Sequence, residues 1–369
     1  MSWLTPGLSD WNFMRHLEIV SWNYRKPPSP DELKFYIAHI NAKGAPDDWF
    51  FDSFLLAPGH TPSGNFLYND INMGTTRNGG GDFFAVPSPN PGSIGDWTFW
   101  LDAVFSAGGF MDCMNESVGR VMDSMRGKPP FARNIVITIP HPHHGQAAFG
   151  KIKPAARHPL NFSVIGQNLA QASAQRLEAV SWFVDEALRR WKKGSWPHLN
   201  LLGFYWHYES LHYSWDVDDH WVIKELYRHV RHRKTRLFWI PFYSTYNVTI
   251  LSNYKDFYFD GAFLQPNHMF YPWLKDVRTA ARQAQDRNAG VEIEYYLNMH
   301  PEFGVGREKY LRLRNYLNTG AEMGFMKDSA CAYYLGSNEL HQIAVHKNPK
   351  ERQAYNDIFH FVKGDYEPR

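Results

Sequence analysis

Short apolar runs alternate along this chain with longer amphipathic runs. The apolar runs have the length of strands and are bounded by residues that favour turns. One of them, N-I-V-I-T-I-P, is a β-branched run of the kind found in strands buried on both faces. The pattern predicts eight strands, at residues 17–24, 49–56, 134–140, 201–209, 236–243, 261–266, 291–296 and 330–335.

Between these strands, apolar residues recur three and four positions apart, with charged residues on the opposite face. The run A-Q-R-L-E-A-V-S-W-F-V-D-E-A-L-R-R-W is one example. Ser29 is placed to cap the first helix and Gly44 to end it. The predicted helices cover residues 30–43, 96–125, 164–193, 219–234, 273–288, 307–323 and 349–363.

Strands that alternate with amphipathic helices favour a parallel sheet built from βα units. A barrel of eight such units takes ~250 to over 400 residues, so the sequence predicts an α/β fold in which residues 1–369 form a single (β/α)8 TIM barrel domain. A stretch rich in Gly, Asn, Pro and Ser follows the second strand and predicts a long insertion loop at about 58–95. Loops at that end of a barrel shape the substrate cleft.

Two of the predicted strands carry carboxylates in alternating positions. In L-L-G-F-Y-W-H-Y-E, at 201–209, Tyr205, His207 and Glu209 share one face, and in V-E-I-E-Y-Y, at 291–296, Glu292 and Glu294 share one face. Either strand alone would also suit an exposed antiparallel sheet. In a barrel, both place a carboxylate at the strand end where active sites lie.

Glycoside hydrolysis uses two carboxyl groups, one to protonate the leaving oxygen and one to attack or to activate water. The arrangement resembles glycoside hydrolase barrels with the acid/base at the end of strand four and the nucleophile at the end of strand seven. That resemblance implies that Glu209 is the acid/base and that Glu294 is the nucleophile or base. Tyr208 stands where those barrels commonly have Asn before the glutamate.

Aromatic and polar residues near the other strand ends predict a sugar-sized pocket. Asp52 is expected to point inward with Phe54 and Leu56 and to lie beside the carboxylate pair. Tyr333 or Tyr334 marks the eighth strand. The alternative role for all these side chains is to plug and seal the barrel. The predicted substrate-binding residues are Trp22, Asn23, Tyr24, Asp52, His141, His143, Tyr205, His207, Tyr243, Gln265, Asn267, Glu292 and Tyr333.

Four longer motifs resemble an uncharacterised bacterial group, domain-of-unknown-function family 4855. They are W-F-F-D-S-F-L-L at 49–56, I-P-H-P at 139–142, G-F-Y-W-H-Y-E at 203–209 and R-Q-A-Y-N-D-I-F-H-F-V-K-G at 352–364. The resemblance covers nearly the whole chain. It implies a hydrolase-like barrel with no settled activity.

Two other functions compete with glycoside hydrolysis. His141, His143 and His144, in I-P-H-P-H-H-G, could bind a metal ion with Asp52, as in a metal-dependent carbohydrate deacetylase. A non-catalytic glycan-binding barrel would use the same carboxylates to bind sugar hydroxyls.

Composition narrows the set of partners. A net charge of +2 argues against nucleic acid and anionic membranes, and no run approaches the ~18 apolar residues of a membrane span. We expect a soluble protein, cytoplasmic or secreted with its signal peptide absent from this chain. Aromatic residues, at 16%, can stack on sugar rings, so we expect a carbohydrate substrate. Without a dinucleotide-binding or P-loop motif we expect no cofactor, and the oligomeric state stays open.

Overall fold

The computed structural model describes residues 2–21, 27–58, 91–245, 248–273, 276–297, 307–336 and 339–369. Most of the predicted insertion loop, residues 59–90, lies outside these ranges, as do Trp22, Asn23 and Tyr24. Within the described ranges, no helix combines the length and the apolar character that a bilayer span requires.

Eight parallel strands close into a barrel in the order β1-β10-β9-β8-β7-β6-β5-β4. The ring is closed by β1, which pairs in parallel with both β4 and β10. The predicted TIM barrel and its eight strands are confirmed. The barrel strands are β1 (His16–Ser21), β4 (Ser53–Ala57), β5 (Arg133–Ile139), β6 (Leu199–Trp206), β7 (Arg236–Trp239), β8 (Gly261–Leu264), β9 (Gly290–Glu294) and β10 (Cys331–Tyr334).

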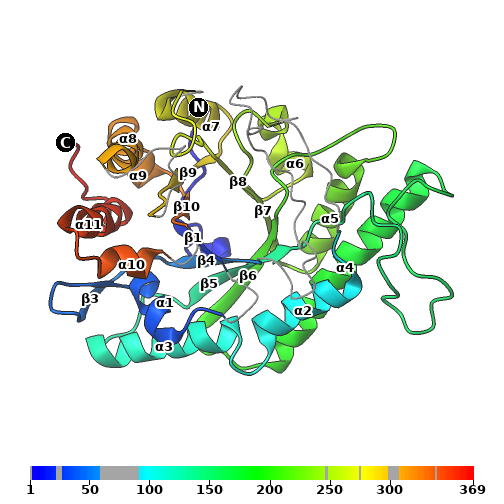
Figure 1. Ribbon diagram of the computed structural model, residues 1–369, viewed down its shortest axis with the longest axis horizontal. Coiled ribbons are helices and arrows are strands. Elements are labelled where there is room, and N and C mark those ends of the chain that lie inside the picture. Colours follow the sequence, from blue (N-terminus) through cyan, green and yellow to red (C-terminus); the bar gives the residue numbers. More distant parts are fainter. Residues whose placement is uncertain are drawn as a thin grey trace.

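Helices surround the strands as an outer layer (Figure 1). Their amphipathic pattern explains this position: in α7, Val277, Ala280, Ala281 and Ala284 are buried along one face. The α-helices are α1 (Pro30–Ile37), α2 (Ile94–Phe105), α3 (Phe110–Met125), α4 (Leu169–Lys193), α5 (Asp219–His232), α6 (Tyr254–Phe257), α7 (Val277–Asp286), α8 (Arg307–Met323), α9 (Phe325–Asp328), α10 (Leu340–Ala344) and α11 (Pro349–Lys363). Two 3-10 turns, η1 (Ser9–Trp11) and η2 (Val248–Ser252), complete the described elements.

The first helix begins where the sequence predicts and ends earlier. Ser29 caps α1 in a capping box, in which Glu32 N donates to Ser29 Oγ at 3.3 Å and Ser29 N donates to Glu32 Oε2 at 2.7 Å. The helix stops at Ile37, not at residue 43. The following residues form β2 (Ala38–Ile40), which pairs antiparallel with β3 (Pro46–Trp49).

Gly44 lies in the turn of this hairpin, not at the end of a helix. Its φ of +78° is a left-handed conformation that favours glycine. Because Trp49 belongs to the hairpin, the strand predicted from residue 49 begins only at Ser53.

The predicted helix 96–125 is divided into α2 and α3 near Gly108 and Gly109. Gly108 has a φ of +72°, and a Cβ atom on Gly109 would lie 2.6 Å from the carbonyl oxygen of Ala103. Only glycine fits this turn, so the chain changes direction here.

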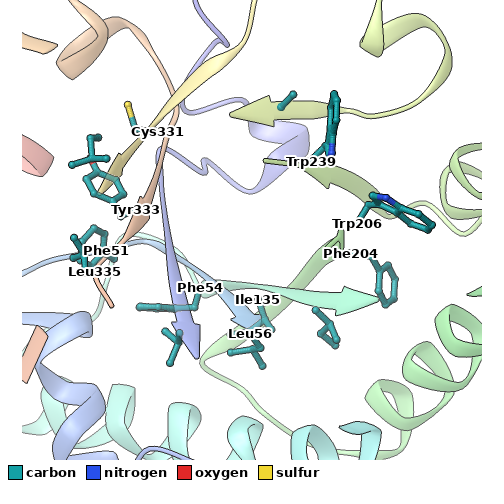
Figure 2. Close-up of a cluster of buried hydrophobic side chains, with 14 of the residues drawn as sticks. Phe51, Phe54, Leu56, Ile135, Phe204, Trp206, Trp239, Cys331, Tyr333 and Leu335 are labelled. Atoms are coloured by element: carbon teal, nitrogen blue, oxygen red, sulfur yellow. The ribbon is translucent and has the colours of Figure 1, made fainter. Parts of the chain in front are cut away.

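Strand side chains alternate between two apolar layers. Leu17, Leu55 and Phe238 belong to a smaller cluster that fills the barrel interior. A larger cluster lies between the strands and the helices, and Figure 2 shows part of it, including Phe204 and Trp239. The strand phase therefore decides which side chains reach the interior.

Candidate active site

The carboxylates of the predicted pair lie at the same end of the barrel. Glu294 is the last residue of β9, and Glu209 follows the end of β6 by three residues. Tyr205 of β6 belongs to the interior cluster. Trp206, the last residue of β6, and Tyr208, two residues beyond it, belong to the outer cluster, so the predicted alternation is confirmed for these residues. Glu209 stands in phase with Tyr205.

Glu209 is partly exposed and has a side-chain amide as its donor. Nε2 of Gln265 donates to Oε1 of Glu209 at 2.8 Å, and the same Nε2 also donates to the carbonyl oxygen of Ile240 at 3.3 Å. Burial raises the pKa of Glu209 to about 7, against the opposing effect of the Gln265 hydrogen bond. This carboxyl group can hold a proton near neutral pH.

Glu294 is buried and accepts hydrogen bonds from a phenol and two backbone amides. The Tyr316 hydroxyl donates to its Oε2, Asn267 N donates to Oε1 at 3.1 Å, and Met269 N donates to Oε2 at 3.4 Å. Burial raises the pKa of Glu294 to about 7, the three donors lower it, and the charge of Glu209 raises it further. The two carboxyl groups therefore influence each other electrostatically.

The segment after β8 contacts both carboxylates. Gln265 reaches Glu209 through its side chain, and Asn267 reaches Glu294 through its backbone amide. Asn267 has a φ of +54°, in the left-handed region that Asn tolerates better than most residues. This conformation belongs to the turn that aims the amides at Glu294.

One face of α8 holds this segment in place. Arg312 donates to the Met269 carbonyl, and Asn315 Nδ2 lies 3.0 Å from Nε2 of His268. The Tyr316 hydroxyl accepts from His268 N at 2.8 Å and from Met269 N at 3.2 Å while it donates to Glu294. Sequence reasoning missed Tyr316 and Met269, because contacts between a helix and a distant loop leave no local pattern.

A third carboxyl group lies deeper in the barrel. Glu292 is buried on the same strand face as Glu294. Burial raises its pKa well above the usual range, and the charges of Glu294, Glu209 and Glu18 raise it further. Tyr205 lies nearby, since burial and then the charges of Glu209 and Glu292 raise its pKa. Burial therefore favours the neutral form of Glu292.

Asp52 lies at the opposite end of the barrel from the pair. It directly precedes β4, and its carboxylate accepts from the amides of Arg15 and His16, at 3.1 and 3.3 Å, where β1 begins. Phe54 and Leu56, expected to share its inward face, belong to the outer cluster. The expected position of Asp52 is wrong, because a strand that is apolar on both faces does not reveal its phase.

Tyr333 likewise lies outside the barrel interior. It belongs to the outer cluster, and its hydroxyl lies 2.8 Å from Nδ1 of His16. Of the two tyrosines on this strand, Tyr334 lies near the carboxyl groups. Burial raises its pKa, and Tyr296, Glu292 and Glu294 are among the groups that raise it further. The inward position before Tyr333 is taken by Ala332.

His141 packs against outward-facing aromatic residues at the end of β6, and His143 packs edge-on against His141, with ring centres 6.2 Å apart. The ring of His141 lies 5.5 Å from that of Trp206 and 4.5 Å from that of Tyr208, both outward residues. Burial lowers the pKa of His143 to about 4, and that of His141 falls well below its usual value. The expectation that both contact substrate stays a prediction.

The metal alternative gains no support from these histidines. His143 stacks on His144 with ring centres 4.7 Å apart, and Asp52 is at the other end of the barrel. Among the described residues, no group of three or more His, Cys, Asp or Glu side chains could hold a metal ion.

His207 and Tyr243 lie at the mouth end of their strands. Burial lowers the pKa of His207 to about 4, so its ring is neutral, and its carbonyl accepts from the Tyr205 hydroxyl at 3.4 Å. Tyr243 is buried, and its amide donates to the carbonyl of Gln265 at 3.1 Å. The Tyr243 backbone thus supports the residue that contacts Glu209.

The profile of a protein family described as "Domain of unknown function (DUF4855)" matches residues 26–360. A search of curated proteins found no match. A solved GH18 chitinase from Pseudoalteromonas aurantia is similar, with 11% identity, 92% of this chain and 99% of that chain covered, and a TM-score of 0.44.

Two other similar solved structures have TM-scores of 0.43. One is a GH5-4 broad specificity endoglucanase from an uncultured bacterium, with 11% identity and 97% of this chain and 96% of that chain covered. The other is a glycoside hydrolase family 5 enzyme from Prevotella bryantii B14, with 10% identity and 97% of this chain and 100% of that chain covered.

Proposed function

The chain belongs to the DUF4855 family, and we propose that its barrel hydrolyses glycosidic bonds of a poly- or oligosaccharide, with Glu209 as the acid/base and Glu294 as the nucleophile or base. The observation that carries the proposal is the unequal hydrogen bonding of two carboxyl groups at one end of one barrel. Glycoside hydrolysis needs this inequality, since one carboxyl group must hold a proton while the other is ionised.

Glu209 is suited to be the general acid. Among the described residues it has one amide donor, and its pKa is about 7, so a large fraction carries a proton near neutral pH. In the proposed reaction this proton passes to the glycosidic oxygen as its bond to the anomeric carbon breaks. The resulting carboxylate then accepts a proton from the water that completes hydrolysis or, in an inverting enzyme, is reprotonated from solvent.

Glu294 also has a pKa of about 7, and its hydrogen bonding is what suits it to be the ionised partner. Its three donors stabilise the carboxylate and oppose the effect of burial on its pKa. It would attack the anomeric carbon or accept a proton from an attacking water. Burial favours the neutral form of Glu292, below it, and so opposes a second negative charge there.

The remaining pocket residues have proposed roles in binding sugar hydroxyls and ring faces. Tyr205 faces the barrel interior from β6, and His207 and Glu209 follow the end of that strand. Trp22, Asn23 and Tyr24 stay predicted substrate contacts, and their positions lie outside the described residues.

Substitution of each carboxylate tests the proposal. Glu209→Gln should abolish turnover of natural glycans, and Glu209→Ala should keep measurable activity on aryl glycosides with a highly acidic leaving phenol, because that phenol needs no protonation. Glu294→Gln should lose activity on both kinds of substrate. Glu322→Gln is a matched control, since Glu322 lies on α8 in an exposed ion pair with Arg278.

If the protein binds glycans without turning any over, the glutamine substitutions should leave this binding unchanged. That result would favour the non-catalytic glycan-binding barrel. Full activity of both variants would refute the assignment. For an active enzyme, proton NMR of the first-formed anomer separates the roles of Glu294: retention means a nucleophile and inversion means a base.

A further inference from the structure

Two tryptophan side chains are far more exposed than packing requires. Trp215 is 80% exposed and Trp273 is 62% exposed, the highest values for tryptophan among the described residues. Trp215 lies between β6 and α5, and Trp273 lies between β8 and α7. Both segments follow strands at the barrel end that holds Glu209 and Glu294.

Trp215 stands at the tip of a braced hairpin. Tyr213 and Asp218 form an antiparallel bridge, and Ser214 N donates to the carbonyl of Val217 at 2.8 Å across the turn. Tyr213, beside it, is 60% exposed. The hairpin thus presents two aromatic rings to solvent on a backbone with its own hydrogen bonds.

The base of this hairpin is tied to the barrel by a buried ion pair. Asp219 accepts from His212 N at 2.9 Å through one carboxylate oxygen and pairs with Arg176 of α4 through the other. Both side chains of the ion pair are 1% exposed. Because its backbone is already held in place, the hairpin loses little conformational entropy when it binds a ligand.

Trp273 follows the turn whose backbone amides donate to Glu294. Asn267, whose amide donates to Glu294, accepts from Tyr271 N at 2.9 Å. The Tyr271 ring packs edge-on against that of Trp273, with centres 5.7 Å apart. The position of this second exposed indole is therefore set by the same backbone that positions the carboxylate.

We propose that Trp215 and Trp273 are stacking platforms for sugar rings and that the substrate is a polysaccharide chain occupying both platforms as well as the carboxylate pair. This inference rests on the proposed function for the position of the cleaved bond. Indole faces stack on the apolar C–H faces of pyranose rings. Two platforms on separate loops suit a substrate of several consecutive sugar units.

The platforms are tested by measuring polysaccharide binding to a variant that cannot turn its substrate over. In Glu209→Gln protein, affinity gel electrophoresis against soluble β-glucan, xylan, mannan, starch and glycol chitin should reveal a retarding polysaccharide. Adding Trp215→Ala or Trp273→Ala should weaken that binding about tenfold each. Phe13→Ala is the control, since Phe13 is 47% exposed and lies at the other end of the barrel, just before β1.

In the otherwise unsubstituted chain, both tryptophan variants should raise KM for the polysaccharide, and Phe13→Ala should leave it unchanged. Polysaccharide binding that depends on both tryptophans in a protein without hydrolase activity would overturn the proposed function and keep the platforms. Unchanged binding in both variants, or no binding to any of the five polysaccharides, would overturn the platforms. A dimer in size-exclusion chromatography that Trp215→Ala dissociates, with binding unchanged, would assign Trp215 to contact with a second copy.

Discussion

The side-chain amide of Gln265 donates to the carboxylate of Glu209 at 2.8 Å, although the two residues follow strands that are not neighbours in the barrel. The amide spans the end of β7, where it also contacts the Ile240 carbonyl. The proton affinity of Glu209 therefore depends on a residue from a different βα unit.

Gln265→Ala should raise the pKa of Glu209, because it removes a donor that stabilises the carboxylate. If Glu209 must be protonated to act, the basic limb of the kcat/KM profile should move to higher pH, by about half a unit to one unit. Gln283→Ala, on the outer helix α7, serves as the control. A basic limb that stays in place would mean that another group sets it.

Tyr316→Phe removes a donor from Glu294 and should raise the pKa of that carboxyl group. Because the proposed nucleophile or base must be ionised, the acidic limb of the pH profile should move to higher pH. The amides of His268 and Met269 also lose this acceptor, at a cost of about 1–3 kcal/mol in the free energy of unfolding.

Tyr310→Phe is a matched control on the same helix, since its hydroxyl donates to Asp357 and not to the site. It should lower stability without moving the acidic limb. Equal shifts in the two variants would point to a general loosening of α8 and away from a specific effect on Glu294.

Asp219→Asn breaks the buried ion pair with Arg176 and should lower the free energy of unfolding by about 3–5 kcal/mol, because it leaves a buried charge without its partner. Urea unfolding measures the loss. Glu322→Gln removes an exposed partner of Arg278 and should cost less than about 1 kcal/mol. Similar losses in both variants would show that the Arg176 charge finds other compensation.

Glu18→Met should stabilise the fold at pH 8. Glu18 is buried, burial raises its pKa well above the usual range, and neither carboxyl oxygen has a hydrogen-bond partner among the described residues. A carboxyl group with a raised folded-state pKa favours folding at low pH and loses that advantage as the pH rises through its folded pKa.

The gain from Glu18→Met should therefore be about 1–3 kcal/mol at pH 8 and clearly smaller at pH 4, as measured by thermal unfolding at both values. Glu18→Gln keeps the shape and removes the titration, so its stability relative to the parent should depend on pH in the same direction. A gain that does not change with pH would mean that Glu18 ionises freely in the folded protein.

The sequence predicted the barrel well because each strand has a local signal. The 201–209 run alternates polar and apolar residues, and its inward face was assigned correctly for Tyr205. The second strand is apolar on both faces, so its pattern could not show that Asp52 begins it at the far end. The same ambiguity placed Tyr333 inside the barrel, where Ala332 lies.

The residues that donate hydrogen bonds to Glu209 and Glu294 also differ in how far the sequence revealed them. Gln265 and Asn267 were singled out because they follow a recognisable strand, but they were predicted as substrate-binding residues and not as donors to Glu209 and Glu294. Tyr316 was missed because it lies on an outer helix, 22 residues beyond Glu294, and its contact with that carboxylate exists only after the barrel closes. Long-range contacts of this kind need the tertiary structure.

The stretch from Gln265 to Trp273 has its length fixed by three contacts: Gln265 on Glu209, Asn267 on Glu294, and Tyr271 on Trp273. One added residue displaces the following chain by up to about 3.4 Å, more than a hydrogen bond tolerates. An insertion within this stretch would disturb acid, base and platform together. Natural or engineered length variation in this connection should therefore accumulate after Trp273, where new sugar contacts can be gained without altering proton transfer.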